Sequence, residues 1–153
     1  GSHLLDTAMF WFGVPDSPFK VVSANRFENK SFDHISFVSN GRPLLQMEMT
    51  LLTWRNHFYA DILAEKGSAH IESLCKWGPS TFTLRDRKLP SGRPDESSET
   101  LIQADPTWDA EYAHFKKLCA DPVANGFGNI ENDIWLNRTL NQLTTDALGE
   151  NNG

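Results

Sequence analysis

The sequence predicts an α+β fold in which helices cover one face of a predominantly antiparallel sheet. Apolar residues recur with a helical period over residues 4–12. Between residues 19 and 104 the pattern changes to short β-rich segments separated by turn signals, and after residue 105 helical spacing returns. Because a run of strands followed by helices favours an α+β arrangement, we expect residues 1–153 to form a single domain. We expect its open sheet to have about six or seven strands.

The first helix is expected over residues 4–12. The segment ends at Gly13 and Pro15, which are typical of the residues that follow a helix. Its apolar face consists of Leu4, Leu5, Ala8, Met9 and Phe12.

The strands are expected where β-formers alternate with polar residues between turn signals. The dipeptide Asn40-Gly41 predicts a hairpin between the second and third of these segments. The Pro- and Ser-rich residues 89–99 are expected to form an exposed loop. The expected strand segments are FKVVSANRF (19–27), SFDHISFVS (31–39), PLLQMEMTLLTW (43–54), HFYADILAE (57–65), AHIESLCKW (69–77), STFTLRDRK (80–88) and TLIQA (100–104).

The third strand segment has two different faces. One face is apolar and carries Leu45, Met47, Met49 and Leu51, whereas the other face mixes leucines with polar residues. A sheet covered on one face leaves the other to water or to a partner. The half-apolar second face therefore favours a partner.

Two further helices are expected at the C-terminal end. Asp105 is expected to be an N-cap residue, with Pro106 at the first helical position. The last helix is expected over residues 129–148. The apolar positions of the two helices are Trp108, Tyr112, Phe115, Leu118 and Cys119, and Ile130, Ile134, Leu136, Leu140 and Leu143.

The composition excludes some classes of partner. The net charge is −6 and the pI is about 5.3, so no broad basic surface for nucleic acid is expected. No apolar run reaches the roughly 20 residues that span a bilayer, so we expect no membrane partner. Cys75 and Cys119 lie far apart in no metal-ligand spacing, which favours reduced thiols and a cytoplasmic protein. His34, His70 and His114 also show no metal spacing, so we expect structural or surface roles and no metal site.

Several short motifs occur in a recognisable order. The pattern G-x-H-x-x-D is formed by Gly1, His3 and Asp6, and an aromatic helix and a glycine follow it. A strand segment ends at Trp54, and G-x-A-x-I follows at residues 67–71. A late helix carries E-x-x-x-F from residue 111 to residue 115. Taken together, this order resembles the C-terminal domain of the Gfo/Idh/MocA (glucose–fructose oxidoreductase, inositol dehydrogenase) family over nearly the whole chain.

This resemblance implies a dihydrodipicolinate-reductase-like C-terminal domain that binds a sugar, inositol or related polyol. Members of the family begin with a Rossmann domain that holds the nicotinamide, and this chain has no G-x-G-x-x-G after a strand. We therefore expect this chain to be the C-terminal domain of a longer parent enzyme. In that parent, NAD or NADP would be bound mainly by the missing N-terminal domain, and no cofactor is expected in this chain. The parent would be an NAD(P)-dependent dehydrogenase, and this domain alone is expected to be inactive. A homodimer or homotetramer through the sheet face is also expected.

The resemblance also points to candidate site residues. His3 is the candidate catalytic acid/base, because a neutral imidazole can accept a hydroxyl proton near neutral pH. Asp6 follows at i+3 on the same helix face and could orient His3 or bind a hydroxyl. Trp54, Arg55 and His57 are candidate substrate-binding residues. Trp54 offers an apolar face for sugar C–H groups, and Arg55 offers fixed donors.

Two other functions remain open from the sequence. The domain could be a non-catalytic binding or regulatory module of the same fold. It could also be a stand-alone sugar-binding or hydrolytic protein, although no G-x-S-x-G or H-E-x-x-H motif is present.

Overall fold

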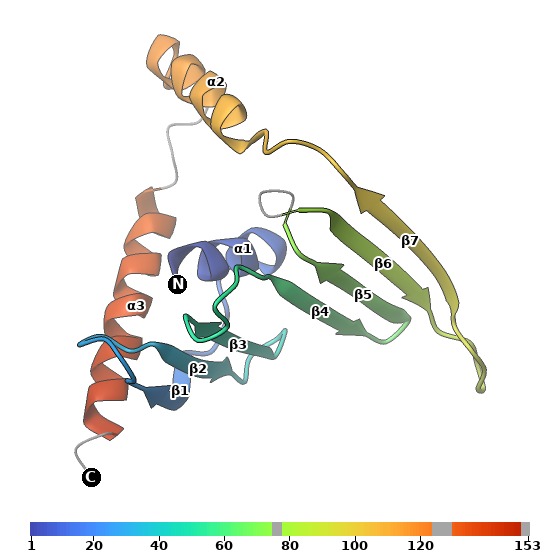
Figure 1. Ribbon diagram of the computed structural model, residues 1–153, viewed down its shortest axis with the longest axis horizontal. Coiled ribbons are helices and arrows are strands. Elements are labelled where there is room, and N and C mark those ends of the chain that lie inside the picture. The colour runs from blue at the N-terminus through green and yellow to red at the C-terminus, as the bar shows by residue number, and fades with distance from the viewer. Residues whose placement is uncertain (75–77, 124–129, 151–153) are drawn as a thin grey trace. The chain divides into compact units, whose positions relative to one another are not determined.

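The computed structural model describes residues 1–74, 78–123 and 130–150 (Figure 1). The chain divides into two compact units, which are described separately. Unit 1 comprises Gly1–Trp54 with Gly128–Gly153, and unit 2 comprises Arg55–Phe127. The elements are α1 (Ser2–Phe12), β1 (Phe19–Asn25), β2 (His34–Ser39), β3 (Leu45–Thr50), β4 (Tyr59–Ala64), β5 (Gly67–Glu72), β6 (Ser80–Asp86), β7 (Asp95–Leu101), α2 (Thr107–Ala120) and α3 (Ile130–Glu150).

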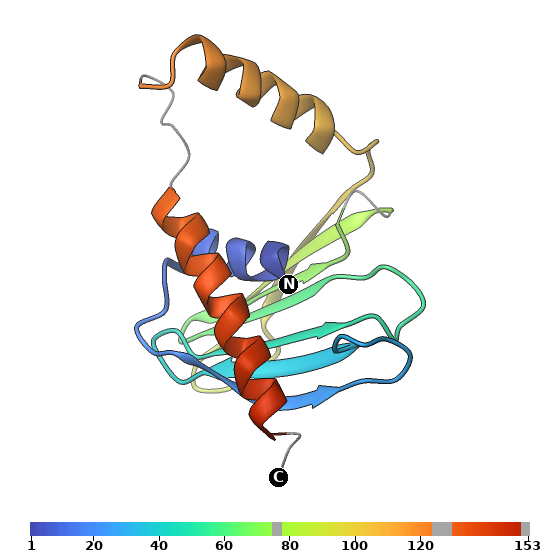
Figure 2. The same cartoon turned by 90° about the vertical axis from the view of Figure 1, so that its left-hand side faces the viewer.

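Unit 1 is a three-stranded antiparallel sheet covered by helices. The strand order is β1-β2-β3, and α3 packs against both β1 and α1 (Figure 2). Phe37 and Leu5 are fully buried between these layers, and the ring of Phe19 meets that of Phe37 edge-on at 5.2 Å. Apolar residues from α1, the sheet and α3 therefore share one core.

The connection between β1 and β2 is fixed by Asp33, whose side chain is only 2% exposed. Its Oδ1 atom accepts a hydrogen bond from the side-chain amide of Asn29. Its Oδ2 atom accepts backbone N–H bonds from Phe27, Glu28 and Asn29 at 2.7–3.2 Å. Because these bonds stabilise the charged carboxylate, they hold the pKa of Asp33 well below its usual range.

Unit 2 contains a four-stranded antiparallel sheet in the order β4-β5-β6-β7. Residues opposite one another in the register share a face, so the two faces can be assigned from the pairing. One face is mainly apolar and the other carries hydroxyl and charged side chains. The apolar face includes Ala60, Ile62, Ala69, Ile71, Phe82 and Leu84.

None of the described residues of unit 2 is buried. On the apolar face of the sheet, Phe82 is 44% exposed and Leu84 is 38% exposed. Helix α2 also has no buried residue, and its Trp108, Tyr112 and Phe115 are all exposed. The described residues of unit 2 thus form no covered core like that of unit 1.

The fold class predicted from the sequence is confirmed at the level of an α+β protein with antiparallel sheets. The seven described strands hydrogen-bond as sheets of three and four, whereas the sequence predicted one open sheet. The ladder stops after β3, where Trp54 adopts a left-handed backbone with φ of 57°. The two sheets are joined through this non-extended segment.

Several element boundaries differ from the predicted ones. Strand β7 begins at Asp95, inside the segment expected to be an exposed loop. Helix α2 begins at Thr107 with Pro106 as its N-cap, so Asp105 lies one residue further out than expected. Leu51 follows the end of β3 and is 66% exposed, although it was expected on the buried face. Cys119 is an exposed free thiol, whereas Cys75 lies outside the described residues.

Candidate functional site

A hollow of about 290 Å³ in unit 2 brings Arg55 and His57 together. Both residues were predicted from the sequence to bind substrate. The remaining lining residues come from the segment entering β4 and from the facing ends of β5 and β6. They are Asn56, Phe58, Tyr59, Glu72, Ser73, Pro79 and Thr81.

The register of the sheet explains why distant residues meet at this hollow. Tyr59 pairs with Glu72, and Glu72 pairs with Thr81, so the three side chains form one rung on one face. Ser73 has a left-handed backbone with φ of 65°, and its N–H donates to the carbonyl of Phe58 at 2.8 Å. This bond closes the end of the β4–β5 pair and fixes one wall of the hollow.

The chemistry of the hollow suits a ligand rich in hydroxyl groups. Arg55 and Asn56 supply donors, Glu72 supplies an acceptor, and Ser73 and Thr81 can donate and accept. The rings of His57 and Tyr59 lie 5.5 Å apart at an angle of 58°, which gives the site an aromatic edge. Polar groups beside an aromatic surface can bind both the hydroxyl and the C–H faces of a polyol.

His3 and Asp6 lie on α1 in unit 1, and both are exposed. The carbonyl of His3 accepts a hydrogen bond from the Thr7 hydroxyl at 2.7 Å. Within the described residues, no hydrogen bond or ion pair joins the side chains of His3 and Asp6. Their assignment as catalytic and orienting groups stays a prediction.

Trp54 is the last residue of the first segment of unit 1 and is 76% exposed. A left-handed backbone is uncommon for a bulky residue, and such conformations occur often at functional sites. The division between the units falls directly after Trp54, so Trp54 belongs to unit 1, whereas Arg55 and His57 belong to unit 2.

A second polar cluster, on the polar face of the β4–β7 sheet, was not predicted from the sequence. His70 Nδ1 lies 2.6 Å from Asp61, and His70 Nε2 lies 2.8 Å from the Ser68 hydroxyl. Arg85 Nη1 lies 3.0 Å from the same Nε2 atom, and Arg85 Nε donates to Glu96 at 2.7 Å. The chain of contacts therefore crosses all four strands.

The direction of these hydrogen bonds follows from Arg85, which can only donate. His70 Nε2 must then accept, so Nδ1 carries the proton and donates to Asp61. Arg85 already occupies the Nε2 lone pair that a general base would need to accept a proton from Ser68, which argues against a catalytic Ser68–His70–Asp61 arrangement. The hydrogen bond and the charge of Arg85 also lower the pKa of Glu96. The cluster links the four strands through side-chain contacts, and the structural role of His70 stays a prediction.

Among the described residues, no group of three or more His, Cys, Asp or Glu side chains is placed to hold a metal ion. In the same part of the chain, no helix has both the length and the hydropathy needed to cross a bilayer. Comparison of the chain with protein-family models, curated proteins and solved structures finds no match.

Proposed function

We propose that this chain is the substrate-binding and oligomerisation domain of an NAD(P)-dependent oxidoreductase that acts on a hydroxyl carbon of a sugar, inositol or related polyol. The observation that supports this proposal most directly is the 290 Å³ hollow of unit 2. It places Arg55 and His57, which the family resemblance singles out, among further groups that can bind hydroxyls.

In this proposal the hollow of unit 2 binds the polyol. The acid/base role of His3 is a separate prediction for the parent enzyme, in which His3 would take up the proton of the reacting hydroxyl. The nicotinamide would accept the hydride from the same carbon. All described strand pairs are antiparallel, so the described residues contain no parallel βαβ turn of the kind that cradles a dinucleotide. The described residues therefore supply no cradle of this kind, and the proposal assigns the nicotinamide to the Rossmann domain of the parent enzyme.

The oligomerisation role is supported by the uncovered apolar face of the β4–β7 sheet. A mainly apolar sheet face with Phe82 and Leu84 more than one-third exposed is typical of an interaction surface. A second copy of the chain would cover this face in a homodimer or homotetramer. In the same proposal, the two sheets would be parts of one open sheet of the dihydrodipicolinate-reductase-like kind.

The direct test is a thermal-shift titration of the chain with myo-inositol and a panel of sugars, beside NAD(H) and NADP(H). We expect a weak, saturable shift with at least one polyol, which Arg55→Ala and His57→Ala reduce. Lys66→Ala, on the β4–β5 turn, is the control and should leave the shift unchanged. A saturable shift with a nicotinamide would contradict the assignment of the cofactor to residues outside the chain.

A second candidate, a non-catalytic binding module, is favoured by the exposed and unlinked side chains of His3 and Asp6. The two candidate functions predict different results in the intact parent enzyme. His3→Ala should lower turnover at least about 100-fold if His3 is the acid/base. Polyol binding with no turnover, and no response to His3→Ala, would favour the module.

A further inference from the structure

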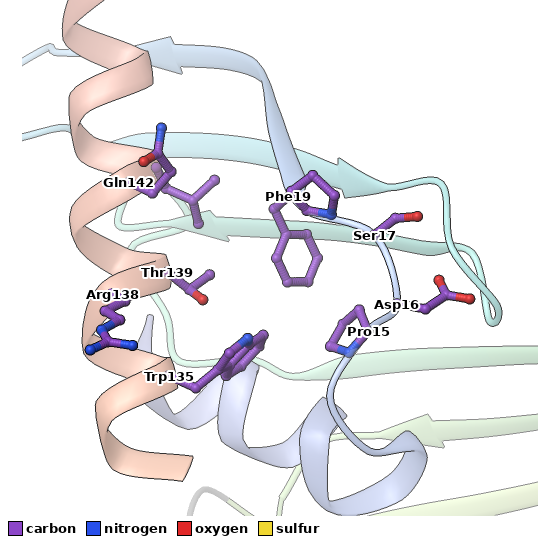
Figure 3. Close-up of a pocket in the computed structure, with 10 residues that line it drawn as sticks. Pro15, Asp16, Ser17, Phe19, Trp135, Arg138, Thr139 and Gln142 are labelled. Atoms are coloured by element: carbon purple, nitrogen blue, oxygen red, sulfur yellow. The ribbon is translucent and has the colours of Figure 1, made fainter. Parts of the chain in front are cut away.

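A separate hollow of about 370 Å³ lies in unit 1, between α3 and the segment that leads into β1 (Figure 3). None of the residues predicted from the sequence to bind substrate lines it. Its walls come from two stretches of chain. They are Pro15, Asp16, Ser17, Pro18 and Phe19 from the first stretch, and Trp135, Arg138, Thr139, Gln142 and Leu143 from α3.

The apolar part of this hollow is built from rings. Figure 3 shows Phe19, Trp135 and Pro15 around the same space. The ring centroids of Phe19 and Trp135 are 6.5 Å apart and their planes are tilted by 54°, so they form an angled wall. The ring of Phe19 also packs edge-on against the ring of Phe37, so this wall is continuous with the packed core. Such a wall is suited to one side of a flat ring.

Several polar groups that line the hollow lack a hydrogen-bond partner within the described residues, and the first is the hydroxyl of Thr139. Thr144 and Thr145, further along α3, donate their hydroxyls to carbonyls four residues earlier, at 2.9 and 3.0 Å. Thr139 makes no such bond within the described residues, and Figure 3 shows its side chain directed toward the hollow. A helical threonine can satisfy its hydroxyl by bonding to the carbonyl four residues earlier. Thr139 does not do so, and its hydroxyl can therefore bind a ligand.

Arg138 is the second group. Its guanidinium makes no hydrogen bond or ion pair within the described part of the chain, and it lines the same hollow. Among the other polar side chains at the rim, Asp16 and Gln142 have partners, whereas the Ser17 hydroxyl makes no hydrogen bond within the described residues. Asp16 Oδ1 accepts the Arg42 N–H at 3.1 Å, and Gln142 Nε2 donates to Asp146 at 2.7 Å. The donors without a partner are thus the guanidinium of Arg138 and the hydroxyls of Thr139 and Ser17. A cation beside a hydroxyl matches a carboxylate.

We propose that this hollow is a binding site for a small aromatic carboxylate. The ring of the ligand would lie against Trp135 and Phe19, and its carboxylate would accept hydrogen bonds from Arg138 and Thr139. A volume of about 370 Å³ falls within the range of small-molecule sites, which are mostly apolar with a few placed polar groups. The site involves unit 1 alone, so it stands independently of the polyol hollow in unit 2.

The test uses sodium benzoate as the probe and benzamide as its neutral counterpart. Binding is followed by ¹H–¹⁵N NMR of the whole chain, through the indole N–H of Trp135, which is assigned with Trp135→Phe. We expect a saturable shift with benzoate and affinity at least about tenfold weaker for benzamide, since the charge-assisted bond is lost.

Two sets of variants test the two polar groups. Thr139→Val should weaken benzoate binding, whereas Thr139→Ser should retain it. Thr144→Val is the matched control, because its hydroxyl already bonds within the helix, and it should bind like the unchanged protein. Arg138→Gln should weaken binding about tenfold, with Arg93→Gln as the control for charge alone.

Amide spectra that remain dispersed show that each variant is folded. Three results would each overturn the proposal: no saturable shift with benzoate, equal affinity for benzamide, or equal effects of Thr139→Val and Thr144→Val.

Discussion

The sheets of unit 1 and unit 2 have similar amphipathic strands but very different surroundings. In unit 1, Phe37 is fully buried between the sheet and α3. In unit 2, the equally apolar Phe82 is 44% exposed, because no described element of that unit covers its face of the sheet. The alternation of apolar and polar residues therefore determines which face can be buried, but another element must supply the cover.

The comparison also separates two ways of holding strands together. Unit 1 relies on shared apolar burial across three layers. Unit 2 carries side-chain bonds between strands on its polar face, such as Thr81 with Thr100 at 3.1 Å and Thr83 with Ser98 at 3.0 Å. Such exposed bonds contribute little to stability compared with apolar burial. Unit 2 is therefore expected to be the less stable of the two by itself.

The largest expected effect is the difference between two matched phenylalanine truncations. Phe37→Ala should destabilise unit 1 by about 3–5 kcal/mol, because it leaves a cavity in a closed core. Phe82→Ala should cost less than about 1.5 kcal/mol at low protein concentration, since its ring is already partly in water. Native-state hydrogen exchange of amides in β2 and β6 measures both. Equal losses would show that the two sheets are equally covered.

The next effect concerns the apolar face of unit 2. Leu84→Asp places a charge on the face that a second copy would cover, so it should weaken self-association at least about tenfold. Thr83→Asp, on the opposite face of the same strand, is the control and should have little effect. Sedimentation across a range of concentrations measures the change. A strict monomer for the unchanged chain would contradict the oligomerisation role.

A third prediction concerns acid and unit 1. Because the pKa of Asp33 is lower in the folded state, its contribution to stability is present above its unfolded pKa of about 3.9. That contribution is lost as the pH falls from about 4 toward the lower folded value. Asp33→Asn should remove this acid-sensitive part of the free energy of unfolding. Urea unfolding between pH 6 and pH 2 checks it, and an unchanged pH slope in Asp33→Asn would refute it.

The smallest expected effect belongs to the cross-strand tie of unit 2. Arg85→Met removes the bonds to both Glu96 and His70, but the pair with Glu96 is half-exposed, so the loss should be about 0–1 kcal/mol. Lys66→Met is the control for removing a surface cation. Hydrogen exchange of β6 amides measures it, and a loss of several kcal/mol would mean that polar ties replace a core in this unit.

The sequence predicted elements best where local pattern and final burial agree. The helix over residues 4–12 matches α1, because its apolar spacing faces the real core. Strand β7 was missed in part, because Asp95-Glu96-Ser97-Ser98-Glu99 contains no strong β-former. Its extended form comes from pairing with β6, which local propensity does not reveal.

The candidate site also combines residues that a local sequence pattern identifies with residues that only the folded structure brings together. Arg55 and His57 are neighbours in the sequence and share one hollow. Glu72, Ser73 and Thr81 join them only through the strand register, which no short motif encodes. The unused hydroxyl of Thr139 could not be inferred either, since the sequence alone does not separate it from Thr144.

The two edges of the unit 2 sheet differ in their resistance to aggregation. Strand β7 is an outer strand, all of its residues are exposed, and it carries Asp95, Glu96 and Glu99. Negative charges along an edge repel an identical strand, so addition of further strands is opposed there. Strand β4 forms the other edge, with the sequence YADILA and a single acidic residue. Any lengthening of this sheet by strand addition should therefore occur at β4, which makes the growth of the sheet directional.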